Sequence, residues 1–101
     1  MMDLRISLIK MLKRLLEDMQ VVQQQGAGYY SCSSVAKRYN KLLEQARTLF
    51  PEAHGLISTF DAAPEADPKD PGDKMKLMQD MRIEIAQLIS LLESSAEAGT
   101  S

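Results

Sequence analysis

The sequence contains no tryptophan, and aromatic residues make up only 5% of its 101 residues. So low an aromatic content disfavours a β-sandwich and favours a core of Leu, Ile and Met side chains. No apolar run approaches the ~20 residues that a membrane-spanning helix needs. Lys10, Lys13 and Arg14 interrupt the N-terminal apolar residues, which therefore do not form the core of a signal peptide. These absences predict a soluble protein without a transmembrane segment.

Reactive and metal-binding side chains are equally scarce, since Cys32 and His54 are the only cysteine and histidine. A lone cysteine cannot form a disulfide within the chain, which favours a reducing, cytoplasmic location. Neither residue belongs to a metal-ligand spacing and no Gly-rich phosphate loop follows a strand pattern, so we predict no metal and no cofactor. Cys32 begins a predicted helix, whose dipole can lower a thiol pKa, but the simpler interpretation is a small residue near a helix cap.

The net charge of −2 is close to zero, which argues against a dedicated nucleic-acid-binding protein. The charges are nevertheless unevenly distributed. Residues 25–50 carry four cations and one carboxylate (+3), whereas residues 51–73 carry six carboxylates and one lysine (−5). We expect the acidic loop and the basic second helix to attract each other or to remain solvated.

Apolar periodicity predicts three main helices, at about residues 3–24, 32–50 and 71–94. The apolar sector of the first helix is about 160° wide, so this helix needs two neighbours. Its members are Leu4, Leu8, Met11, Leu12, Leu15, Leu16, Met19 and Val22. The second helix has one apolar side as well, with Ser31 or Ser34 as its predicted N-cap and Pro51 just after its end.

The third helix has the clearest start signal, because Asp70 is suited to the N-cap and Pro71 to the first helical position. Apolar residues then follow at steps of three, four, three and four, the spacing of a helix that packs along another helix. This apolar seam consists of Met78, Met81, Ile85, Leu88 and Leu92.

The predicted fold is therefore an all-α, small helical bundle that forms one domain over residues 1–94. About twenty residues connect the second and third helices, far more than the median of ~4–6. Residues 61–71 of this acidic, Pro-rich connection are predicted to be a flexible loop, and residues 95–101 a disordered tail. Such a long tether leaves open the direction of the third helix, and whether it packs within its own chain or across a dimer.

The apolar surface exceeds what three helices with few aromatic residues comfortably close over, which favours a homodimer or a helical protein partner. We therefore predict a non-enzymatic protein-protein interaction or adaptor module. The predicted partner or oligomer contact is the apolar seam, Met78, Met81, Ile85, Leu88 and Leu92.

An alternative function follows from Arg47 and His54, which are separated by six residues. This spacing resembles the Arg, six residues, His signature of HEPN-type helical ribonucleases, which implies that the pair acts at the scissile phosphate. A helical ribonuclease or a toxin–antitoxin component would then use these two residues for catalysis. Pro51 interrupts the helix between them, so the non-enzymatic interpretation is favoured.

A second alternative is peripheral attachment to a membrane surface through the first helix. Arg5, Lys10, Lys13 and Arg14 flank its broad Leu and Met face. Asp3, Glu17 and Asp18 dilute this positive charge, and the helix carries no Trp or Phe to anchor it, so core packing is favoured.

Overall fold

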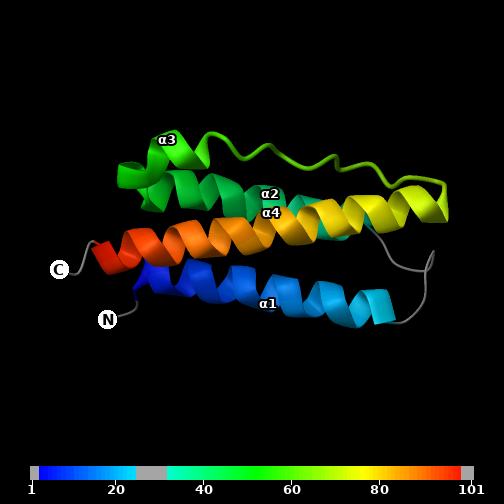
Figure 1. Ribbon diagram of the computed structural model, residues 1–101, viewed down its shortest axis with the longest axis horizontal. Helices are drawn as coiled ribbons and strands as arrows, with labels where there is room; N and C mark the ends of the chain where they lie inside the picture. The colour runs from blue at the N-terminus through cyan, green and yellow to red at the C-terminus, as the bar shows by residue number, and fades with distance from the viewer. Residues whose placement is uncertain (1–2, 25–31, 99–101) are drawn as a thin grey trace.

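Three long helices make up most of the structure, a computed structural model that describes residues 3–24 and 32–98 (Figure 1). They are α1 (Leu4–Gln24), α2 (Cys32–Leu49) and α4 (Pro71–Ala98). A short 3-10 turn, η1 (Pro51–Ala53), and a single helical turn, α3 (His54–Ile57), follow α2. No strand occurs in these two ranges. The prediction of an all-α helical bundle is confirmed, and α1 and α2 end within one residue of their predicted bounds.

Aspartates cap the starts of all three long helices. The Asp3 side chain accepts a hydrogen bond from Arg5 N–H at 2.9 Å, and the Asp70 side chain accepts one from Gly72 N–H at 2.9 Å. The predicted start of the third helix at Asp70 is therefore confirmed. For α2 the cap comes from Asp67, which accepts hydrogen bonds from the backbone of Cys32 at 2.6 Å and of Ser33 at 3.1 Å. Of the two residues that we predicted for this role, Ser31 lies outside the described residues, and Ser34 lies within α2, after its start.

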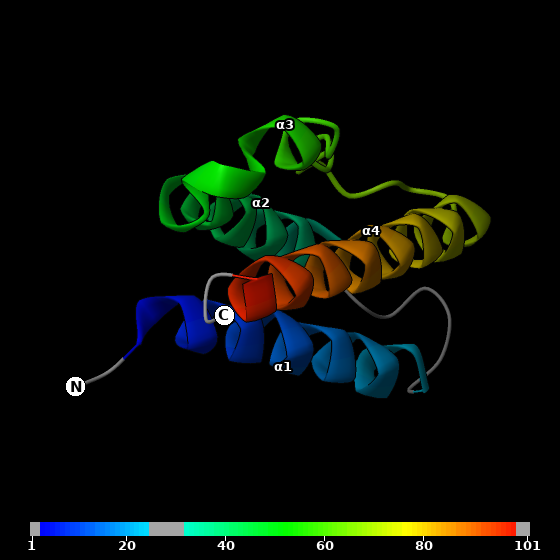
Figure 2. The same cartoon turned by 60° about the vertical axis from the view of Figure 1, so that its left-hand side comes forward.

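The direction of α4 explains why its connection to α2 is so long. In both cartoon views α1 runs antiparallel to α2 and α4, whereas α2 and α4 run parallel (Figures 1 and 2). The chain must therefore return along the whole of α2 before α4 begins. The 18 residues of α2 rise about 27 Å, and the ten residues of the crossover loop, 61–70, reach about 33 Å when extended. A connection of median length could not make this return.

The crossover loop is anchored to α2 although we predicted that it would be flexible. Asn40 accepts a hydrogen bond from Ala63 N–H at 2.7 Å and donates one to the Ala63 carbonyl at 2.9 Å. Asn40 also donates to Glu65 at 2.9 Å. With Asp67 at the start of α2, these contacts hold the loop against α2 on the side away from α1 (Figure 2).

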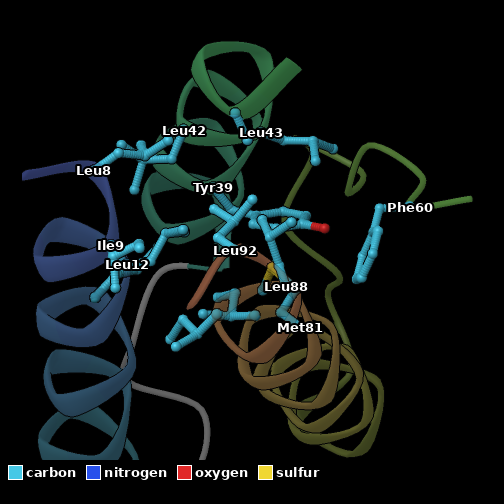
Figure 3. Packing of buried hydrophobic residues seen from close by; sticks show 14 of the residues in the cluster. Leu8, Ile9, Leu12, Tyr39, Leu42, Leu43, Phe60, Met81, Leu88 and Leu92 are labelled. Carbon is cyan, nitrogen blue, oxygen red and sulfur yellow. The ribbon is translucent and has the colours of Figure 1, made fainter. Parts of the chain in front are cut away.

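The apolar seam of α4 lies inside the bundle, where α4 packs against both α1 and α2 (Figure 3). Its five side chains are 0–2% exposed. They share one core with a set of residues from α1, α2 and the α3 region, namely Leu8, Ile9, Leu12, Leu15, Met19, Tyr39, Leu43, Phe50, Ile57 and Phe60. The residues that we predicted to bind a partner are therefore interior residues of a single chain, because the crossover loop brings α4 back onto α1 and α2.

The end of the bundle where α2 stops is held together by contacts of Arg5, Glu52 and Ser95. These contacts join α1, the end of α2, η1 and α4. The Arg5 guanidinium pairs with Glu52 and lies 4.2 Å from the centroid of the Phe50 ring. The Ser95 hydroxyl donates a hydrogen bond to Glu52 at 2.9 Å. Ala96 packs against the core, and α4 continues to Ala98, so residues 95–98 are helical rather than part of the predicted tail.

Candidate functional site

A groove between α1 and α2 is lined mainly by apolar side chains. Its volume is about 460 Å³, and all of its lining residues belong to α1 or α2. Leu8 and Leu42 form its floor, where the two helices meet (Figure 3). Leu4 and Met11 stand above this floor and remain 62% and 42% exposed. We call this feature the α1–α2 groove.

The spacing of these side chains follows from two regular stripes. On α1, Leu4, Leu8 and Met11 recur at steps of four and three, while on α2 Leu42 and Leu49 are seven residues apart. Such spacings place apolar side chains along one edge of each helix at every turn or second turn. The two antiparallel stripes therefore form an apolar channel parallel to the helix axes.

The rim of the α1–α2 groove carries unpaired positive charge on its α2 side. Arg38 and Lys41 both line the groove and are exposed. In residues 3–24 and 32–98 neither side chain forms a hydrogen bond or ion pair. The acidic rim residue Glu44, in contrast, is paired with Arg47 at 3.0 Å.

A second hollow of about 400 Å³ lies between α1 and α4. It is lined by Leu16, Gln79, Arg82, Ile83 and Ala86, and Ile83 is 57% exposed. Ile83 is part of neither the apolar seam nor the Arg47 and His54 pair. It lies on the side of α4 opposite the apolar seam.

Arg47 and His54, the alternative catalytic pair, lie on different elements. The Arg47 guanidinium donates to Glu44 at 3.0 Å and to the Phe60 carbonyl at 3.5 Å, so two of its nitrogens already have acceptors. His54 begins α3 and is exposed. No hydrogen bond joins these two residues within the described ranges.

Tyr39 places a polar atom in the core. Its side chain is 1% exposed, and its hydroxyl points toward the side where Phe60 and the crossover loop lie (Figure 3). Among the described residues this hydroxyl finds no hydrogen-bond partner. Burial, reinforced by the negative charge of Glu84, raises the pKa of Tyr39 to about 12. The phenol is therefore neutral and cannot act as a base near neutral pH.

Cys32 is fully buried at the start of α2, and its thiol lies 3.6 Å from the Lys74 carbonyl. Burial raises the pKa of this thiol, and the neighbouring Asp67 raises it further, against the opposing effect of Lys74. The helix dipole therefore does not produce a reactive thiolate here. Within residues 3–24 and 32–98, no three His, Cys, Asp or Glu side chains are grouped to hold a metal ion.

No family model matches the chain, and comparisons with curated proteins and with solved structures find no similar protein. In the part of the chain that the structure describes, no helix has both the length and the apolar character required to cross a membrane. The α1–α2 groove therefore has to be interpreted from its own residues. Sequence reasoning missed it because Leu4 and Met11 belong to the same wide apolar sector as the core residues, and only their position at its edge distinguishes them.

Proposed function

We propose that this protein is a non-enzymatic interaction module that binds a helix of a partner protein in the α1–α2 groove. The observation that carries the proposal is the exposure of Leu4 and Met11 above an apolar floor. Burying two such side chains under a partner is favourable by about 1.5–3 kcal/mol for each one that becomes fully buried. We place this function in the cytoplasm, since a single buried thiol fits a reducing compartment.

A helix is the occupant that best matches the groove. Two stripes with steps of three, four and seven residues create holes at the spacing of helical knobs. Together with the adjoining hollow around Arg14, Leu15 and Asp18, the channel follows α1 from Leu4 to Asp18, or about 21 Å. A partner helix of about four turns would fill it.

The membrane alternative has less support from α1. Leu4 and Ile6 are both exposed, but at 100° per residue they lie about 160° apart around the helix. An interfacial helix needs its apolar side chains on one continuous face. The ribonuclease alternative likewise lacks support, because the Arg47 guanidinium is already engaged by Glu44 and Phe60.

Site-specific photo-crosslinking tests the proposal. Gln45, on the groove rim, is replaced by a photoreactive phenylalanine in cells that naturally express the protein, and Asp80, an exposed residue of α4, is replaced as the matched control. We expect a crosslinked product with one protein partner from position 45 and not from position 80. Met11→Lys should abolish this product while leaving the circular dichroism spectrum unchanged, because Met11 is exposed.

Two results would overturn this assignment. One is the same set of products from positions 45 and 80, or products that persist in Met11→Lys. The other is a position-45 product that contains only a second copy of this chain, which would identify the groove as a homodimer contact.

A homodimer through the α1–α4 hollow is the second candidate, supported by the exposure of Ile83 beside the partly buried Leu16. Light scattering at micromolar concentration measures the mass. This candidate predicts a dimer that Ile83→Lys converts to a monomer, whereas a wild-type monomer would rule it out.

A further inference from the structure

We propose that the helix bound in the α1–α2 groove is acidic along the edge that faces α2, with carboxylates that pair with Arg38 and Lys41. This inference rests on the proposed function and adds the chemistry of the partner. Both cations line the groove beside the apolar floor, and no carboxylate among the described residues pairs with either.

The other charges near the groove are already balanced within the chain. Arg14 pairs with Asp18 at 3.1 Å, and Glu44 pairs with Arg47 at 3.0 Å. The net charge presented to an occupant is therefore that of Arg38 and Lys41. These residues are three apart on α2, so they lie one turn apart on the same side of the helix. A partner helix would meet both with carboxylates spaced three or four residues apart.

The chain's own acidic segment does not fill this role. Asp67 and Glu65 of the crossover loop are bound to Cys32 and Asn40, on the side of α2 that faces away from α1. A second copy is also a poor occupant of this groove. Two grooves related by a two-fold axis would bring the cations of one copy toward the same cations of the other, and like charges repel.

The partner's acidic edge adds specificity to an otherwise generic apolar contact. Exposed ion pairs contribute little binding free energy, so two of them should change the affinity by about tenfold. Most of the affinity should come from the apolar contact. Their contribution should also fall as salt screens them, whereas the apolar contact should not weaken.

A displayed library of amphipathic helices tests this inference. Each helix is about 16 residues long, which matches the channel. Leu occupies one face, and the flanking positions vary among Glu, Gln and Lys. Selection is carried out on the wild type and on Met11→Lys. We expect Glu to be enriched on one flank, and a Glu-flanked helix to bind the wild type about tenfold more tightly than its Lys-flanked counterpart at 50 mM salt.

The charge-reversed variant Arg38→Glu/Lys41→Glu should invert this preference, and 500 mM salt should largely abolish it. Both positions are exposed, so the variant should keep the wild-type unfolding transition. As a matched control, Lys37→Glu changes an exposed cation of α2 that does not line the groove, and should leave the preference unaltered.

The outcomes separate this inference from the proposed function. Helices that bind wild type but not Met11→Lys, without any preference for Glu, would overturn the acidic partner and leave the groove as a binding site. If no selected helix binds the wild type more tightly than Met11→Lys, the proposed function is overturned as well. Tighter binding of the groove to phosphatidylglycerol vesicles than to any helix would assign it to a membrane surface and overturn both.

Discussion

The carboxylate of Asp67 accepts a hydrogen bond from the backbone N–H of Cys32, which precedes it by 35 residues, at 2.6 Å. This contact satisfies a backbone donor at the first turn of α2 and places negative charge at the positive end of that helix. Asp70 does the same for α4 three residues later in the chain. The acidic loop therefore serves the N-termini of two parallel helices, which accounts for part of its negative charge.

Replacing Asp67 by alanine removes this distant cap. We expect Asp67→Ala to lower the free energy of unfolding by about 1 kcal/mol, the usual contribution of a capping side chain. Asp67→Asn keeps an acceptor and should retain most of the stability. Urea denaturation followed by circular dichroism measures both. Asp80→Ala, an exposed carboxylate on α4, is the control and should change the stability by less than about 0.5 kcal/mol. Equal losses from Asn and Ala at position 67 would contradict the capping role.

Asn40 is the second anchor of the crossover loop, through its paired hydrogen bonds to the backbone of Ala63. We expect Asn40→Ala to lower the stability by about 1–2 kcal/mol, because it leaves backbone groups of a half-buried residue without partners. Cleavage after Glu65 by a glutamate-specific protease under native conditions should become faster. Lys37→Ala, on an exposed site of the same helix, provides the comparison. Unchanged cleavage in Asn40→Ala would mean that other contacts hold the loop.

Tyr39 makes stability depend on pH in the alkaline range. The pKa of its buried phenol is about 12 in the folded protein, above the ordinary value of 10.0. The folded state therefore retains a proton that the unfolded state loses between these values. Stability should be unaffected below pH 10 and should fall between pH 10 and 12, by at most about 1.4 kcal/mol per pH unit.

The variant Tyr39→Phe should lack this alkaline loss, and the difference between the two proteins isolates it from the titration of lysines. Because the hydroxyl has no partner among the described residues, Tyr39→Phe should also be as stable as wild type at pH 7, or more stable by about 1 kcal/mol. A variant that is less stable than wild type at pH 7 would show that the hydroxyl is hydrogen-bonded in solution.

Glu52 makes stability depend on pH in the acidic range, where stability should fall as the pH is lowered. Its own backbone N–H, the Ser95 hydroxyl and Arg5 all favour the charged form, so the pKa of Glu52 lies below its ordinary value. This stabilisation is present above the ordinary glutamate pKa and is lost as the pH falls through the lowered value. We expect Glu52→Gln to lose less stability than wild type between pH 7 and pH 3 in urea denaturation, whereas Glu17→Gln, an exposed control on α1, should behave as wild type. Parallel behaviour of Glu52→Gln and wild type would contradict this coupling.

The helices could be predicted because their signals are local. Apolar periodicity located α1 and α2 to within a residue, and Asp70 followed by Pro71 fixed the start of α4. The spacing of the apolar seam also indicated correctly that α4 packs along other helices. Whether those helices belonged to the same chain could not be read from the spacing, since an intramolecular and an intermolecular contact require the same pattern.

The features that the sequence did not reveal all depend on contacts between distant segments. The cap of α2 by Asp67 and the pairing of Asn40 with Ala63 join residues 35 and 23 positions apart. Beyond Ser94, α4 also contacts a distant segment, since the Ser95 hydroxyl donates a hydrogen bond to Glu52. The candidate groove forms along the edge of the apolar sector of α1 that α2 does not cover. Which edge this is depends on how the helices pack and not on the sequence of α1 alone.

The parallel arrangement of α2 and α4 makes the protein respond asymmetrically to insertions and deletions in residues 61–66. Doubling the length of a loop costs only about 0.6 kcal/mol in chain entropy, so an epitope inserted after Glu65, which leaves the pairing of Asn40 with Ala63 in place, should leave the bundle intact. Removing four residues shortens the reach by about 13 Å, and α4 could then no longer begin beside the start of α2. It would be forced to pack in the reverse direction, with its methionine-rich first turns against the Phe50 end of the core. The length of this segment thus determines the direction in which α4 packs. Evolution or engineering can lengthen the segment but cannot shorten it without changing the topology.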